Sequence, residues 1–91
     1  MASHSIKDKI AQGATIVDVR TVDEYEDGYY SGAINIPVNA LEKRMGEIGA
    51  KDKPVIVYCA SGSRSAVAMS ILKSRGFTDV MNAGGLDDMP N

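Results

Sequence analysis

Hydrophobic residues in this chain are concentrated in four short runs that are separated by polar segments. The clearest run is Pro54 to Tyr58, and the other three span residues 14–19, 33–36 and 80–82. Runs of this length, rich in valine and isoleucine and bounded by glycine, proline or polar residues, are typical of buried β-strands. We therefore predict a strand at each run.

The first two polar segments carry signals for short helices. Ser5, with an acidic residue three positions later, predicts a helix over about residues 6–12 that Gly13 stops. Residues 21–27 are polar and predict a short helical turn between the first two strands.

Two further helices are predicted in the second half of the chain. Asn39 begins a second capping signal, for a helix that runs to about Ile48. The clearest helix spans Ser65 to Arg75, with Ser65 as its N-terminal cap and Gly76 at the position that commonly ends a helix.

Strands and helices thus alternate along the chain, which predicts an α/β fold. Alternation of this kind favours a parallel sheet that is covered by helices on both faces. Ligands of such sheets bind beyond the carboxyl ends of the strands. Cys59 directly follows the strand at residues 54–58, so we expect it at the ligand-binding end of the sheet.

Length and composition narrow the possible functions. Ninety-one residues predict one small domain over residues 1–91. The net charge of −2 argues against nucleic-acid binding, which usually shows a basic face. A single cysteine excludes an internal disulfide, a multi-cysteine metal site and a resolving cysteine within the chain.

The sequence also bears on localisation. No apolar run approaches the roughly 20 residues that a membrane-spanning helix needs, and the N-terminus lacks the apolar core of a signal peptide. We expect a cytoplasmic protein, although the mature form of an exported precursor would have the same sequence features.

The stretch from Cys59 to Ser65 carries the candidate chemistry. A thiol between a strand and a helix faces backbone N–H groups and the positive end of the helix dipole, and both stabilise the reactive thiolate. Four small residues separate Cys59 from Arg64, so the backbone can curl around a group on the sulfur. Gly62 permits a positive φ in that curl, and Arg64 offers planar donors suited to an oxyanion.

This loop resembles the active-site loop of the rhodanese (thiosulfate sulfurtransferase) family, whose pattern is Cys-x-x-Gly-x-Arg-Ser. The defining positions are all filled here, by Cys59, Gly62, Arg64 and Ser65. Two other signatures of the family occur in the right order, within residues 16–25 and 32–37. The resemblance extends over about residues 14–85. It implies a rhodanese-like parallel sheet of about four to five short strands with helices on both faces.

The resemblance also implies roles for the loop residues. We predict that Cys59 is the catalytic nucleophile and that the substrate-binding residues are Ala60, Ser61, Gly62, Ser63 and Arg64. A buried structural cysteine is the alternative for Cys59, but the small neighbours and Arg64 favour the reactive role. Ser61 and Ser63 either supply hydroxyl donors or are present only because they are small. We expect no metal and no cofactor.

Other polar and aromatic residues have structural interpretations. Asp18 ends a buried strand, where its carboxylate needs donors, and we expect it to tie the strand end to a neighbouring loop. Arg20 and Glu24 are predicted to form an exposed ion pair, and His4 is predicted to be solvated. Tyr25, Tyr29 and Tyr30 have two interpretations. We favour packing in the core with one ring exposed, and the alternative is that they form a wall beside the pocket.

Two thiolate chemistries suit the loop, sulfur transfer and phosphoryl transfer. In the first, Cys59 attacks the outer sulfur of a donor anion such as thiosulfate, sulfite leaves, and cyanide or an acceptor thiol then takes the sulfur from the persulfide. Phosphatases of related folds use a Cys-x5-Arg loop, whereas Cys59 and Arg64 form the shorter Cys-x4-Arg.

We therefore predict a single-domain sulfurtransferase. The principal alternative is a persulfide carrier or docking module that serves a protein partner, and a phosphatase or arsenate reductase is disfavoured by the loop length. The expected partners are a small sulfur-donor anion and an acceptor thiol or cyanide, with a protein as a further possible acceptor. We expect neither a nucleic acid nor a membrane as a partner.

Overall fold

The protein is described by a computed structural model that covers the backbone of residues 2–91 and the side chains of residues 6–91. The predicted solvation of His4 lies outside the described side chains. Four strands form one parallel sheet in the order β2-β1-β3-β4. Their bounds are Thr15–Asp18 for β1, Ile34–Asn35 for β2, Val55–Cys59 for β3 and Val80–Gly85 for β4.

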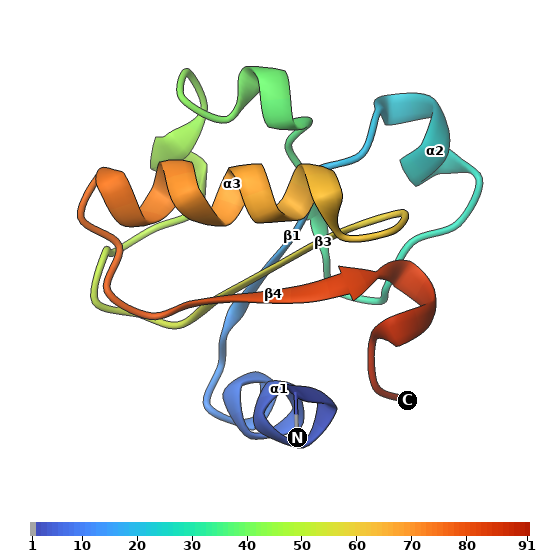
Figure 1. Cartoon of the computed structure of the whole chain (residues 1–91), viewed down its shortest axis with the longest axis horizontal. Coiled ribbons are helices and arrows are strands. Elements are labelled where there is room, and N and C mark those ends of the chain that lie inside the picture. Colours follow the sequence, from blue (N-terminus) through green and yellow to red (C-terminus); the bar gives the residue numbers. More distant parts are fainter. Residues whose placement is uncertain (1) are drawn as a thin grey trace.

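Helices cover both faces of this sheet (Figure 1). The helix α3 (Ser63–Ser74) lies on one face, and α1 (Ala2–Ala11) lies on the other. The short helix α2 (Val22–Glu26) connects β1 to β2. The α/β fold with a parallel sheet of four strands, covered on both faces, confirms the predicted fold class.

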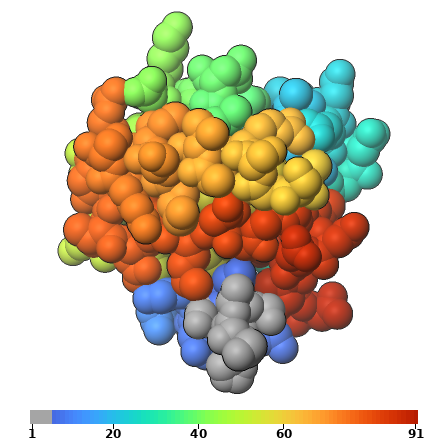
Figure 2. Space-filling view, viewed as in Figure 1, coloured from blue at the N-terminus to red at the C-terminus, as the bar shows by residue number. Residues whose placement is uncertain are grey.

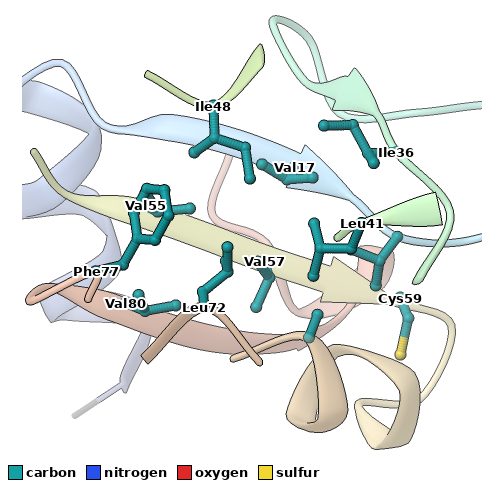
Figure 3. Close-up of a cluster of buried hydrophobic side chains, with 12 residues drawn as sticks. Val17, Ile36, Leu41, Ile48, Val55, Val57, Cys59, Leu72, Phe77 and Val80 are labelled. Carbon is teal, nitrogen blue, oxygen red and sulfur yellow. The ribbon is translucent and has the colours of Figure 1, made fainter. Parts of the chain in front are cut away.

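Alternation along β3 divides the core into two layers. Successive side chains of a strand point to opposite faces, and every residue of β3 is buried. Val55, Val57 and Cys59 belong to a cluster beneath α3, which Figure 3 shows, whereas Ile56 and Tyr58 belong to the cluster beneath α1. Cys59 is therefore both the last residue of the central strand and a member of the core beneath α3.

The predicted helix from Asn39 to Ile48 is wrong. Two 3-10 turns replace it, η1 (Val38–Ala40) and η2 (Met45–Glu47). Arg44 leaves helical geometry between them, with φ −113° and ψ 17°, and its guanidinium donates to the Asn35 carbonyl at 3.1 Å. Gly46 further weakens a helix here. Leu41 and Ile48 of this segment are nevertheless buried, so the two turns bring apolar side chains to the core.

Smaller corrections concern helix ends. The helix α1 begins at Ala2, so Ser5 lies within it and is not its cap. Gly76 follows the C-terminal end of α3 with φ 98°, as predicted for a helix-ending glycine. No helix of the described residues is long and apolar enough to cross a membrane.

Candidate active site

Cys59 lies at the carboxyl end of β3, between the neighbouring strands β1 and β4. Its side chain is fully buried. Figure 3 shows the sulfur directed toward the turn that begins α3. The central position follows from sequence, since the most apolar strand takes the middle of a parallel sheet and its carboxyl end opens on the ligand-binding edge.

The loop after Cys59 is packed backbone against backbone on the end of β4. A Cβ atom added to Gly85 would lie 2.2 Å from the Ala60 carbonyl oxygen, and one added to Gly62 would lie 3.3 Å from the Cα of Gly84. Glycine is thus required at Gly85 by close approach, and at Gly62 also by its φ of 103°. The glycine pair 84–85 has a role in shaping the site that the sequence interpretation did not assign.

Two N–H donors and one hydroxyl group surround the sulfur. The Gly62 N–H donates to Cys59 Sγ at 3.0 Å and the Ser65 N–H at 3.4 Å, and the Ser65 hydroxyl oxygen lies 3.4 Å from the same sulfur. The loop therefore points its amides at the thiol, as the sequence predicted.

Ser65 was predicted to cap α3, but it is not the N-cap of that helix. The helix begins at Ser63, and its N-cap is Gly62 in the left-handed conformation. The positive φ turns the chain so that the Ser65 N–H faces the sulfur, and Cys59 Sγ takes the acceptor place of a capping oxygen. Ser65 is instead fully buried, and its hydroxyl meets Asn82 of β4 at 2.6 Å.

The surroundings of Cys59 lower its pKa to about 7. Burial alone raises the pKa of a thiol, because it penalises the charged form. Hydrogen bonds from the Ser65 hydroxyl and from the N–H groups of Ser65, Ser61 and Gly62 outweigh this effect by stabilising the thiolate. About half of the protein should hence carry a thiolate near neutral pH.

We expect the rate of Cys59 alkylation by iodoacetamide to rise with pH around a midpoint near 7, below the roughly 8.5 of a free thiol. The midpoint is the informative quantity, because burial lowers the absolute rate at every pH. Glutathione measured beside the protein supplies the reference. A midpoint at or above that of glutathione would show that the amides do not stabilise the thiolate.

Arg64 lies in the first turn of α3, and its side chain reaches α2. Its Nη1 and Nη2 atoms donate to the two carboxylate oxygens of Glu24 at 2.7 and 3.0 Å. This bond to Arg64, together with one from the Thr21 N–H, lowers the pKa of Glu24 to about 2. The two side chains remain about one-third exposed, so the guanidinium borders solvent while it is paired. Its predicted contact with a substrate anion stays a prediction.

The predicted Arg20–Glu24 ion pair is wrong. Thr21 is the N-cap of α2 and shares a capping box with Glu24, so Arg20 precedes the helix and cannot lie one turn below Glu24. Arg20 instead forms a buried pair with Asp18, with Nη2 2.6 Å from a carboxylate oxygen. Arg20 also donates to the Gly28 carbonyl at 2.7 Å. Asp18 thus ties the strand end to the following loop, as predicted.

The remaining predicted substrate-binding residues lie within the loop. Ala60, Ser61 and Ser63 are exposed, and within residues 6–91 no hydrogen bond joins either serine hydroxyl to the sulfur. Of the three tyrosines, Tyr30 packs against the core beneath α1, as the favoured interpretation predicted. The rings of Tyr25 and Tyr29 stack with centroids 4.2 Å apart, and Tyr29 is the half-exposed member.

Fold and site together define a class of protein: an α/β protein that carries one activated thiol in an amide-lined loop at the end of a parallel sheet. A family model described as the rhodanese-like domain matches residues 3–89. This chain belongs to that family of rhodanese-like sulfurtransferases, which confirms the family predicted from the loop.

Individual relatives agree with this assignment. The thiosulfate sulfurtransferase PspE of Escherichia coli (strain K12) is 40% identical over 74 residues, which are 80% of this chain and 71% of PspE. The putative sulfur carrier protein YrkF of Bacillus subtilis is 37% identical over 71 residues, which are 78% of this chain but only 38% of YrkF. A solved structure, a rhodanese with anions from E. coli, is 40% identical with a TM-score of 0.79 and covers 85% of this chain and 94% of that one.

Proposed function

We propose that this protein transfers a sulfane sulfur from thiosulfate or a similar donor to cyanide or a thiol, through a persulfide on Cys59. The observation that carries the proposal is the sulfur itself, which is held at the end of the central strand by the Gly62 and Ser65 N–H groups. These donors favour the thiolate, the form that attacks sulfur. Similarity to a thiosulfate sulfurtransferase supports thiosulfate as the donor.

The reaction proceeds in two displacements. The Cys59 thiolate attacks the outer sulfur of thiosulfate, the bond between the two donor sulfurs breaks, and its electron pair leaves with sulfite. An acceptor nucleophile then attacks the outer sulfur of the persulfide, and the Cys59 thiolate leaves with the electron pair of the sulfur–sulfur bond. The amides that stabilise the resting thiolate also stabilise this leaving group. Neither step requires a general acid, since both leaving groups are stable anions.

The direct test is intact-protein mass spectrometry after incubation with thiosulfate. We expect an increase in mass by one sulfur atom, located on Cys59 by peptide mapping and removed by cyanide with release of thiocyanate. An unchanged mass, with the thiol still free to react with iodoacetamide, would contradict the proposal.

We propose that the Arg64 guanidinium also contacts the anionic donor, and that Glu24, which accepts two of its hydrogen bonds, competes for it. Arg64→Ala should lower kcat/KM for thiosulfate roughly tenfold more than for an uncharged persulfide donor, as expected for one charge-assisted contact. Glu24→Gln removes the competing charge and should raise kcat/KM for thiosulfate several-fold. Equal losses with charged and uncharged donors in both variants would instead show that the pair serves only to hold the loop.

A second candidate function, delivery of sulfur to a protein partner, is favoured by the charge around the loop. Figure 2 shows the loop between the segment of α2 and the C-terminal segment. These flanking segments carry five exposed carboxylates that join none of the ion pairs within residues 6–91, namely Asp23, Glu26, Asp27, Asp87 and Asp88. Their field repels a dianion such as thiosulfate and attracts a basic surface.

Acceptor peptides test this second function. A cysteine peptide flanked by lysines should take sulfur from the Cys59 persulfide about tenfold faster than one flanked by glutamates at low ionic strength, and added salt should reduce the difference. Over the same range of salt concentration, kcat/KM for thiosulfate should rise, because salt screens the repulsion between the carboxylates and this dianion. Equal rates for the two peptides at low salt would remove the support that the carboxylates give to a basic partner.

A further inference from the structure

The side chain of Asn82, on β4, has an orientation that its neighbours determine. The Gly84 N–H, which can only donate, lies 2.9 Å from Asn82 Oδ1. The Gly62 carbonyl, which can only accept, lies 3.1 Å from Asn82 Nδ2. The amide oxygen therefore faces Gly84, and the amide nitrogen faces the loop.

A bulge in β4 places Asn82 there. Asn82 pairs with Val57 and Gly84 pairs with Tyr58, so Ala83 is an extra residue between them. A bulge of this kind redirects side chains beside it. The bond from the Gly84 N–H to Asn82 Oδ1 spans the extra residue and gives the amide oxygen a fixed place beside α3.

The Ser65 hydroxyl has several acceptors but one proton. Asn82 Oδ1 is nearest at 2.6 Å, the Gly62 carbonyl lies at 3.1 Å, and Cys59 Sγ lies at 3.4 Å. Because an amide oxygen cannot donate, the short contact with Asn82 requires that the hydroxyl proton point there. The hydroxyl then presents a lone pair to the sulfur, which suits a thiol that donates its S–H.

A thiolate requires the opposite arrangement. An anionic sulfur gains stabilisation only from a hydroxyl proton that points at it. If the Ser65 hydroxyl turns to Cys59, its oxygen and Asn82 Oδ1 are left facing each other without a proton between them. The thiolate and Asn82 thus compete for the same proton.

We propose that Asn82 is a positioning residue that holds the Ser65 hydroxyl proton while the sulfur of Cys59 is neutral and releases it when negative charge develops there. The hydroxyl rotates and no O–H bond breaks, while the thiol proton itself leaves to solvent. During turnover, the hydroxyl would point at Asn82 when the outer sulfur of a persulfide carries the charge. It would turn to Cys59 when that thiolate is expelled. This part of the inference rests on the proposed function, whereas the competition for the proton does not.

The other ionisable groups at this end of the sheet are either bonded within the protein or exposed to solvent. Tyr58 and Asp88 accept backbone N–H groups of Tyr30 and Gly85. Of the charged side chains near the sulfur, Asp18 pairs with Arg20 and Glu24 pairs with Arg64, whereas the five exposed carboxylates of the flanking segments face solvent. Within residues 6–91, no hydrogen bond joins any of these groups to the Ser65 hydroxyl or to Asn82.

A double-mutant cycle tests the proposal, with the pH midpoint of iodoacetamide alkylation as the readout. Asn82→Ala is made in the natural protein and in Ser65→Ala. Asn82→Ala removes the contact between Asn82 and the Gly62 carbonyl in the natural protein and in Ser65→Ala alike. Only in the natural protein does it also free the Ser65 hydroxyl proton. We expect Asn82→Ala to shift the midpoint downward by up to about one pH unit more when Ser65 is present, because the hydroxyl no longer gives up a neutral hydrogen bond to the Asn82 amide when the thiol ionises. Shifts that are equal in the two backgrounds, or that differ in the opposite sense, would overturn the proposal.

A second measurement on the natural protein covers the case in which Asn82→Ala fails to fold. The NMR signals of the Asn82 side-chain NH₂ group should shift with the same pH midpoint as Cys59 alkylation, and this shift should vanish in Ser65→Ala. Signals that do not titrate, or that titrate equally without Ser65, would contradict the proposal. Neither readout requires sulfur transfer, so failure to form a persulfide would overturn the proposed function without affecting this test.

Discussion

Replacement of Cys59 by serine should abolish sulfur transfer and leave the fold intact. Serine is nearly the same size, and its hydroxyl can accept the Gly62 and Ser65 N–H bonds that the sulfur accepts now. It cannot form a persulfide, and Cys59 is the only cysteine of the chain. Thiosulfate:cyanide turnover should fall to the rate without protein, while the free energy of unfolding changes by about 1 kcal/mol or less.

The control for this variant is Ser70→Ala, which alters an exposed residue of α3 and should keep full activity. Circular dichroism and urea unfolding establish that Cys59→Ser is folded. Sulfur transfer by the folded variant above the rate without protein would exclude Cys59 as the carrier.

Gly85→Ala should damage the site almost as severely, although within residues 6–91 no hydrogen bond joins Gly85 to the sulfur. Its new methyl group would lie 2.2 Å from the Ala60 carbonyl oxygen, so the loop or the end of β4 must move. Overpacking of this kind costs about 1–3 kcal/mol of stability. A displacement of about 1 Å in a catalytic loop costs roughly 100-fold in rate. Urea unfolding and kcat/KM for thiosulfate measure the two effects.

Gly46→Ala is the matched control for this second prediction. A methyl group on Gly46 meets no atom within 4 Å, and its φ is not positive. The same chemical change should therefore leave activity within about twofold of the natural protein and stability within about 0.5 kcal/mol. If Gly85→Ala were as active as Gly46→Ala, the packing of the loop on β4 would not be what positions the sulfur.

Much of the fold and the site could be predicted from local patterns. Apolar runs located all four strands, because burial on both faces of a sheet requires them. The position of Cys59 between a buried strand and a helix predicted its place at the edge of the sheet and its stabilised thiolate. The segment at residues 39–48 shows the limit of such patterns. Its capping signal was compatible with both a helix and two turns, and contacts such as that between Arg44 and the Asn35 carbonyl favour the turns.

Partnerships between distant residues were decided only by the tertiary structure. The sequence determined that Arg64 and Ser65 lie where the chain passes from the strand of Cys59 into a helix. It did not determine that Arg64 pairs with Glu24, 40 residues away, or that the Ser65 hydroxyl meets Asn82, 17 residues away. Periodicity and capping report the conformation and burial of each segment by itself. Which polar groups meet across segments depends on the packing of strands and helices, and in this protein that packing brings Asn82 to the serine beside the reactive sulfur.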